Sequence, residues 1–439
     1  MPIASVTKGF TATAIGELVA EGKMDWDSTP VIKYLPEFEL QDLHLSEHLT
    51  MADLLSHRTG FPSFDLAWFR NTESRRDLIK RMRHVKMKPK LSSDCQYNNI
   101  MYAVAGEAAA NVAGVSYEEL VHTKVLKPLG LSNTGFSPSE MRERSSNYAM
   151  PYRAASFEDA QKGKVMQGYL DEIYAADAPA GDRYSNVFDL VRWGHAIMQS
   201  GMLDGKQILN KDSVEETKSG HTFMRKELEG PEFFPTVAYG FGWIINTYKG
   251  QLVYRHDGSN PGYRTNLTLF PEAELVIAHF ANLERGDFII DAPWYIADEL
   301  LGLPKTRDWI NDVSVKRCKA RYNKDAKDAI GSLPALLQDK PPMHPLQEFV
   351  GHYTDPFWGD VSVLMRKEKD GKNENLYFNM RTFDSKMVHY HYNSFQIDLK
   401  DFVLNYRALA TFETGSNGKI TGLRFEVLGM SMPLKRKQD

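Results

Sequence analysis

The chain has 439 residues, which at about 150 residues per domain leaves room for two or three domains. Hydrophobic residues make up 42% and charged residues 25%, values that are typical of a folded globular protein and exclude a disordered or collagen-like chain. Lys and Arg number 53 against 57 Asp and Glu, a net charge of -4, so no basic field exists for a nucleic-acid backbone. We therefore expect no nucleic-acid partner.

Membrane and secretory signals are not evident in the sequence. The longest apolar stretches, such as 100–110, are interrupted by Gly106 and Glu107 and are shorter than the roughly 20 residues that span a bilayer. The first residues lack the basic region and apolar core of a secretory signal. Cys95 and Cys318 cannot build a disulfide framework and have no metal-ligand spacing. These features predict no membrane segment and a reducing compartment, cytoplasmic by default.

The first part of the chain is predicted to be mainly helical. From Ser5 to about Ala20, apolar residues recur at helical spacing and Gly22 follows as a stop signal, which predicts a buried helix. Further helices are predicted over 49–55, 102–112 and 187–201.

The pattern changes after Tyr239 to short strand-like runs that Gly, Asn and Pro turns separate. These runs predict successive antiparallel strands over 241–245, 251–255, 265–270 and 275–282. A helix predicted over 291–301 could pack on that sheet, because Pro293 is tolerated in a first helical turn.

A proline-rich segment, 340–345, is predicted to be a linker at a domain boundary. Beyond it, Asp370-Gly371 and Asn417-Gly418 are hairpin turn signals. At least six short alternating segments predict strands there, and the last hundred residues are expected to form a small β-barrel: 361–365, 376–380, 387–392, 395–399, 408–412 and 423–427.

Ser5 and Lys8 form a Ser-x-x-Lys pattern at the start of the first predicted helix. Three residues are close to one helical turn, so the hydroxyl and the amine share a helix face. Burial and the helix N-terminus both disfavour a charged amine, so Lys8 could accept a proton from Ser5. A helix-capping serine with a solvated lysine is the alternative. The pattern recurs at 416–419, in a predicted hairpin turn without a buried helix start.

Tyr97 and Asn99 lie two residues apart on a loop before the predicted helix 102–112. A phenol beside a lysine ammonium is expected to have a pKa below about 10 and can serve as a general base. Asn99 could bond both Lys8 and a substrate amide. A structural tyrosine in a turn is the alternative.

A Gly-rich segment, 255–263, is expected to link two antiparallel strands. Small residues let a strand backbone approach a substrate closely, and the backbone N–H groups of Ser259 and Ser5 could form an oxyanion hole. The alternative is a plain turn that happens to contain His, Asp and Gly.

In this order, Ser-x-x-Lys, Tyr-x-Asn and His-x-Gly resemble the signature of the β-lactamase and penicillin-binding-protein-like serine hydrolases. The resemblance is to the class C-like branch, with its esterases, D-aminopeptidases and acyltransferases. The runs 49–60, 126–131 and 180–193 are similar to that family too, and the resemblance covers residues 1 to about 300. The expected barrel resembles the lipocalin-like domain found behind many such hydrolases.

The resemblance implies that Ser5 is the nucleophile and that Lys8 and Tyr97 are its proton acceptors. It also implies a set of substrate-binding residues, namely Asn99, His256, Gly258 and Ser259. His256 stands where β-lactamases and transpeptidases place a lysine, and a neutral imidazole removes an anchor for the carboxylate of a β-lactam. Family members have a helix and two sheet strands before Ser-x-x-Lys, whereas four residues precede Ser5, so we expect those strands to be missing.

The predicted fold is α+β, with an antiparallel sheet flanked by helices, an all-helical lobe and a small C-terminal β-barrel. The predicted domains are a catalytic domain over 1–310, a helical and proline-rich linker over 311–345 and a lipocalin-like barrel over 346–439. The predicted function is hydrolysis of an ester or amide in a small molecule or short peptide, through an acyl-enzyme on Ser5, with weak or no β-lactamase activity. An acyltransferase and a non-catalytic, N-terminally truncated binding protein are the alternatives, and assembly into a homo-oligomer is left open.

No cofactor and no metal are expected. A phosphate-binding loop or dinucleotide fingerprint does not follow any predicted strand. His389 and His391 share one face of a predicted strand, but no third ligand is indicated, so they are interpreted as barrel filling. His44 and His48 are interpreted as solvated positions before a helix.

Overall fold

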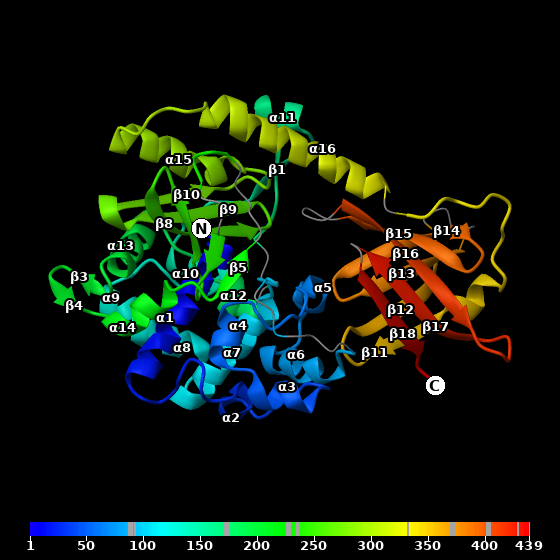
Figure 1. Ribbon diagram of the computed structural model, residues 1–439. Coiled ribbons are helices and arrows are strands. Elements are labelled where there is room, and N and C mark those ends of the chain that lie inside the picture. The colour runs from blue at the N-terminus through cyan, green and yellow to red at the C-terminus, as the bar shows by residue number, and fades with distance from the viewer. Residues whose placement is uncertain are drawn as a thin grey trace. The chain divides into compact units, whose positions relative to one another are not determined.

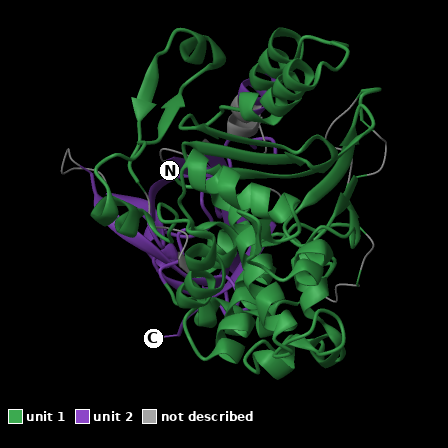
Figure 2. Cartoon of the chain, turned by 90° about the vertical axis from the view of Figure 1, so that its left-hand side faces the viewer, with its two compact units in different colours: residues 1–69, 73–319 green, residues 70–72, 320–439 purple. Residues whose placement is uncertain are grey.

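The structure is a computed structural model that describes residues 1–86, 91, 94–170, 175–224, 230–233, 237–331, 333–368, 374–400, 405–427 and 430–438. The chain divides into two compact units (Figure 2). The first unit comprises residues 1–69 and 73–319, and the second comprises residues 70–72 and 320–439. Each unit is described by itself.

The first unit contains a six-stranded antiparallel sheet with the strand order β10-β9-β8-β7-β6-β5. Its strands are β5 (Thr222–Met224), β6 (Val237–Tyr239), β7 (Ile244–Tyr248), β8 (Gln251–Asn260), β9 (Tyr263–Phe270) and β10 (Leu275–Ala281). The four predicted runs correspond to β7 through β10, whereas the two three-residue strands, β5 and β6, were not predicted. The predicted link over 255–263 is wrong in extent, because β8 continues to Asn260 and only Pro261-Gly262 forms the turn.

Helices make up most of the rest of this unit (Figure 1). They are η1 (Ala4–Val6), α1 (Thr7–Ala20), α2 (Val31–Tyr34), α3 (Leu43–His48), α4 (Met51–Leu55), α5 (Asp65–Trp68), α6 (Arg75–Arg81), η2 (Met82–His84), α7 (Asn99–Ala113), α8 (Tyr117–Val121), η3 (His122–Leu126), α9 (Lys127–Leu129), α10 (Pro138–Arg144), α11 (Phe157–Gln161), η4 (Ala175–Asp177), α12 (Ala178–Gly181), α13 (Val187–Met198), α14 (Lys211–Thr217), η5 (Pro271–Ala273), α15 (Phe288–Leu301) and η6 (Trp309–Ser314). Two small two-stranded sheets pair β1 (Tyr152–Ala154) with β2 (Val165–Gln167) and β3 (Met202–Leu203) with β4 (Lys206–Gln207).

The sheet is covered on both faces at β9, because successive side chains point to opposite faces and all eight residues of this strand are buried. Leu267 and Leu269 of β9 lie against Gly194 of α13, where the absence of a side chain brings the helix close to the strand. The next residue along, Phe270, packs with Trp294 of α15 in a buried aromatic cluster. Figure 1 shows α15 and α13 on opposite sides of β8 to β10.

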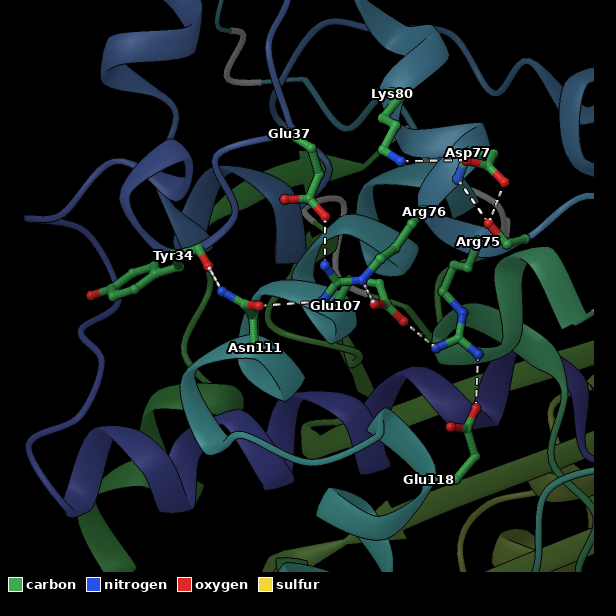
Figure 3. A network of polar contacts seen from close by, with 10 residues as sticks. Tyr34, Glu37, Arg75, Arg76, Asp77, Lys80, Glu107, Asn111 and Glu118 are labelled. Carbon is green, nitrogen blue, oxygen red and sulfur yellow. Dashed lines mark hydrogen bonds and ion pairs between the residues drawn. The ribbon is translucent and has the colours of Figure 1, made fainter.

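Helix α7 is fixed by a network of ion pairs that joins it to α6 and α8 (Figure 3). Arg75 donates to Glu107 of α7 at 2.7 Å and to Glu118 of α8 at 2.8 Å. Arg76 donates to the other oxygen of Glu107 at 3.1 Å and to Glu37 at 2.6 Å. Because Glu107 is buried, removal of its partners would leave an uncompensated charge in the interior. The network therefore orients α7, whose first turn belongs to the site described below.

The second unit is a closed barrel of eight antiparallel strands in sequence order, the up-and-down arrangement of lipocalin-like barrels. Its strands are β11 (Gly351–Asp355), β12 (Gly359–Lys367), β13 (Glu374–Met380), β14 (Phe383–His391), β15 (Ser394–Lys400), β16 (Asn405–Thr414), β17 (Ile420–Val427) and β18 (Met430–Arg436). The barrel closes where Tyr353 of the first strand pairs with Arg436 of the last. This confirms the predicted α+β fold with a C-terminal barrel.

Smaller predictions concern the proline-rich segment before the barrel, two turn signals and His389. The proline-rich segment 340–345 has no regular structure, and helix α16 (Val315–Gly331) precedes it. Asn417-Gly418 lies in the turn between β16 and β17, as predicted, whereas Asp370-Gly371 lies outside the described residues. His389 is exposed on β14 and bonds to the carbonyl of Tyr392, so its interpretation as barrel filling is wrong.

His44 and His48 are exposed and precede the predicted helix, now α4, as expected, and they lie in α3, a short helix that was not predicted. Their rings face each other across one helical turn, with centroids 4.1 Å apart.

Candidate active site

Ser5 lies in the short turn η1, directly before α1. The preceding residue, Ala4, has a φ of 48°, a left-handed conformation that costs a non-glycine residue about 1 kcal/mol. The segment is held by a hydrogen bond from Ile3 N–H to the carbonyl of Arg183 at 2.8 Å. The turn therefore presents a half-buried Ser5 at the start of a buried helix.

Lys8 is completely buried one helical turn after Ser5. Its Nζ lies 3.2 Å from Ser5 Oγ, 2.7 Å from Asn99 Oδ1 and 3.0 Å from the carbonyl oxygen of Ala180. Burial lowers the pKa of Lys8 to about 7, against the opposing effects of Asp177 and Asp65.

The three partners of Lys8 also suit its neutral form. A neutral amine has two N–H donors and one lone pair, and the oxygens of Asn99 and Ala180 can only accept these two hydrogens. The lone pair is then left for the hydroxyl hydrogen of Ser5. The site thus contains an amine that can accept a proton from Ser5 near neutral pH.

Tyr97, on the loop before α7, also contacts Ser5 and Lys8. The Lys8 amine lies 4.7 Å from the centroid of the Tyr97 ring, and a hydrogen bond joins the side chains of Tyr97 and Ser5. Burial raises the pKa of Tyr97 well above 10, and the hydrogen bond with Ser5 opposes that rise only in part. The expectation of a pKa below about 10 is therefore wrong, because desolvation of the phenolate is the largest effect on this group.

Asn99 is the first residue of α7, three residues before the predicted start of that helix. The helix begins here because Asn98 caps it, with Oδ1 accepting the N–H of Met101 at 3.2 Å. The cap fixes the direction in which Asn99 leaves the loop, and its Oδ1 meets Lys8.

Strand β8 runs beside the Ser5 turn at Gly258. A Cβ at this position would lie 2.1 Å from the carbonyl oxygen of Ile3, so only glycine permits this approach. Ser259 follows with an exposed side chain, beyond Arg255, the last residue of β8 that pairs with β7. The oxyanion hole from the N–H groups of Ser5 and Ser259 stays a prediction.

His256 is buried on β8 and neutral. Its Nδ1 lies 2.8 Å from the carbonyl oxygen of Asp257, which can only accept, so Nδ1 carries the proton and Nε2 accepts the hydroxyl of Tyr239 at 3.0 Å. Burial, with a smaller effect of Lys8, lowers the pKa of His256 to about 4. An imidazole with this pKa offers no fixed positive charge at pH 7.

The structure brings Ser5, Lys8, Tyr97 and Asn99 into contact, and the His256 ring lies 6.3 Å from the Tyr97 ring. The second Ser-x-x-Lys, 416–419, is exposed in the turn between β16 and β17.

Sequence reasoning missed four residues around this site: His57, Asp177, Ala180 and Tyr239. Asp177 is buried, and burial raises the pKa of its carboxyl well above 3.8 although Lys8 opposes the rise. His57 and Ala180 lie in runs that carried the family resemblance, but neither run indicated a role. For Asp177 and Tyr239 no local signal existed, since their places depend on tertiary packing.

The described ranges also bear on metal binding and on membrane insertion. No group of three or more His, Cys, Asp or Glu side chains that could hold a metal ion occurs among the residues placed by the structure. Within that same part of the chain, no helix is both long and apolar enough to traverse a bilayer. Cys95 and Cys318, which both lie in the described ranges, are not joined in a disulfide.

Fold and site together define a protein of the β-lactamase type. The beta-lactamase family model matches residues 1–301, and the chain belongs to this family. A second family model, described as a domain of unknown function (DUF3471), matches residues 338–438.

Two similar proteins are about a quarter identical to this chain over the aligned residues. An unguisins hydrolase from Aspergillus campestris is 24% identical over 386 residues, which are 83% of this chain and 68% of that protein. Penicillin-binding protein 4 from Amycolatopsis lactamdurans is 26% identical over 284 residues, 63% of this chain and 71% of that protein.

Two solved structures show the same fold. An octameric penicillin-binding protein homologue from Pyrococcus abyssi has a TM-score of 0.56 and 22% identity, covering 99% of this chain and 88% of its own. A D-stereospecific amidohydrolase from Streptomyces has a TM-score of 0.53 and 22% identity, covering 69% of this chain and 86% of its own. These comparisons confirm the predicted family and fold.

Proposed function

We propose that this protein hydrolyses an ester or amide bond in a small molecule or short peptide through an acyl-enzyme on Ser5. The observation that carries the proposal is the buried amine of Lys8, which lies 3.2 Å from Ser5 Oγ and has its pKa lowered to about 7. A serine hydroxyl is a weak nucleophile, and a neutral amine at this distance is a general base for it.

In the proposed reaction, Ser5 Oγ forms a bond to the substrate carbonyl carbon while its proton passes to Lys8. The carbonyl oxygen becomes an oxyanion, which the N–H groups of Ser5 and Ser259 stabilise. The bond to the leaving alcohol or amine then breaks, and the leaving group takes the proton back from Lys8 through the neutral phenol of Tyr97. Water repeats the sequence on the acyl-serine ester and releases the acid.

This division of roles differs from the one implied by the family resemblance, in which Lys8 and Tyr97 are both proton acceptors. With its pKa well above 10, Tyr97 is a phenol at neutral pH, so it can donate a hydrogen bond and relay a proton but does not start as the base. Asn99 orients Lys8 and remains available to a substrate amide.

The proposed substrates carry no carboxylate that needs a cation at His256. A neutral His256 cannot replace the lysine that binds the carboxylate of a β-lactam, which favours neutral esters and amides over penicillins and cephalosporins. The names of two similar proteins, a hydrolase of unguisins and a D-stereospecific amidohydrolase, support this choice.

The test is covalent labelling of Ser5. Intact-protein mass spectrometry after reaction with an aryl ester or a fluorophosphonate should show one adduct in the wild type and in Ser416→Ala, the matched control in the exposed turn. Ser5→Ala should show none. An adduct that survives in Ser5→Ala refutes the assignment, and the lack of any adduct in the folded wild type favours a non-catalytic binding protein. Transfer of the acyl group to an added amine, faster than its release to water, identifies an acyltransferase.

A further inference from the structure

His57 lies two residues after α4, completely buried and with a φ of 59°. Its carbonyl oxygen accepts the N–H of Gln96 at 2.8 Å, and its side-chain Nδ1 accepts the N–H of Asn98 at 3.2 Å. These two N–H groups stand on either side of Tyr97. A single residue therefore holds the backbone of the Tyr97 loop at two adjacent points.

The imidazole ring of His57 also packs against the ring of Tyr97. Its ring centroid lies 4.2 Å from that of Tyr97, 4.9 Å from Tyr239 and 5.1 Å from Tyr102. The Lys8 amine also contacts Tyr97, at 4.7 Å from the centroid of the phenol ring. A shift of His57 would thus move Tyr97 relative to the amine and to Ser5.

We propose that His57 is a positioning residue for acyl transfer to Ser5, which holds Tyr97 and Asn99 in place through its Nδ1 acceptor and its ring. The inference rests on the proposed function. His57 touches neither Ser5 nor a substrate in this role, and it acts through the Asn98 N–H and the Tyr97 ring.

The chemistry of the ring explains why a histidine serves here. The Asn98 N–H can only donate, so Nδ1 is unprotonated and Nε2 carries the hydrogen. Nε2 is buried without a hydrogen-bond partner in the described part of the chain, which is an unfavourable state for a polar group. A phenylalanine would make the same ring contacts without that penalty. What only the histidine supplies is the acceptor for Asn98.

The surroundings keep His57 neutral. Burial lowers its pKa well below 6.5, and the electrostatic interactions with Lys8 and His256 lower it further. The other titratable groups that face it are the phenols of Tyr97, Tyr102 and Tyr239, which are neutral as well. A proton on Nδ1 would point at the Asn98 N–H and break the contact, so the neutral form is the one that positions the loop.

Three substitutions separate the acceptor from the shape of the side chain. In His57→Asn, Oδ1 stands as many bonds from Cα as Nδ1 does, and asparagine tolerates a positive φ. His57→Leu has the same branching at Cγ without an acceptor, and His57→Gly accepts the backbone conformation without strain. His44→Leu on the exposed helix α3 is the control.

The measurements are kcat and KM for an aryl ester, the rate of fluorophosphonate labelling and the thermal midpoint. We expect His57→Leu and His57→Gly to lose kcat and labelling rate by ten- to about a hundredfold with little change in KM, because small misplacements of reacting groups have effects of this size. His57→Asn keeps the acceptor but loses the ring, so it should lie between the wild type and His57→Leu, about tenfold faster than His57→Leu. Folded His57→Leu or His57→Gly with wild-type kcat, or His57→Asn as slow as His57→Leu, overturns the proposal.

A readout without turnover keeps the two proposals apart. The ¹⁵N chemical shifts of the wild-type His57 ring should show an unprotonated Nδ1 and a protonated Nε2 between about pH 5 and pH 9. A protonated Nδ1 overturns the positioning role even where the variants fail to fold. If the wild type shows this tautomer but Ser5 takes no label, the proposed function fails and the placement of the loop by His57 stands.

Discussion

The pKa of Lys8 makes a quantitative prediction about stability. It is about 7 in the folded protein against an ordinary 10.5, a difference of about 3.5 that corresponds to about 5 kcal/mol of unfolding free energy. Between these two values the unfolded chain binds a proton at Lys8 that the folded chain does not. The destabilising effect is therefore complete below about pH 7 and disappears as the pH rises toward 10.5.

Lys8→Met isolates this effect, because the variant lacks the amine but shares every other titrating group. The unfolding free energy of the wild type, minus that of Lys8→Met, should rise by about 1.4 kcal/mol per pH unit, or about 3 kcal/mol from pH 7.5 to pH 9.5. In the variant, the oxygens of Asn99 and Ala180 lose their donor, which adds an offset that does not change with pH.

Urea unfolding of both proteins at several pH values measures the difference directly. The same titration should appear in catalysis, since kcat/KM for a neutral ester should rise through about pH 7 and then level off as Lys8 becomes neutral. Parallel stability curves for wild type and Lys8→Met would show that the amine is still charged in the folded protein at these pH values. Lys8 would then not be the resting base, and the proposed proton transfer would be refuted.

Three further predictions concern other parts of the molecule. Tyr97→Phe should slow acylation about a hundredfold with little change in thermal midpoint, as expected when a proton relay is removed, and normal turnover would make Lys8 the sole proton-transfer group. Gly258→Ala should lower the unfolding free energy by about 1–3 kcal/mol and slow labelling, because the new methyl group would meet the Ile3 carbonyl oxygen. The control is Gly220→Ala, whose methyl group would meet only a side chain, at 3.1 Å. Equal unfolding free energies of the two variants would contradict the close approach at Gly258. Cleavage within 340–345 should release two folded pieces, as a separable catalytic domain and barrel predict, and cooperative loss of both would place the boundary elsewhere.

The sequence predicted what is encoded locally. Helix α1, helix α7 and the three motifs follow from spacing within a few residues, and the barrel follows from alternation along each strand. The three-residue strands β5 and β6 gave no such signal, because so short a segment becomes a strand only through its neighbours in the sheet. The extent of β8 was missed for a related reason: Gly258 weakens a strand by propensity, whereas contact with the Ser5 turn requires it there.

Electrostatic behaviour was harder to predict than position. The sequence indicated that Lys8 and Tyr97 would meet, but it could not show which effect would decide the pKa of Tyr97. The phenol is covered by groups from distant segments, including the ring of His57, and their combined desolvation raises the pKa against the hydrogen bond with Ser5. For Lys8 the same effect acts on a cation, so burial lowers its pKa, and the predicted direction is confirmed.

The proposed base, Lys8, thus depends on tertiary structure. Lys8 is close to Ser5 because one helical turn separates them, and the four-residue motif is enough to predict this proximity. Its neutral form is favoured only where two further acceptors, from the start of α7 and from α12, take its hydrogens and where the surrounding core excludes water. The exposed copy of the motif at 416–419 has the spacing and neither acceptor segment, so the spacing alone does not reproduce the surroundings of Ser5.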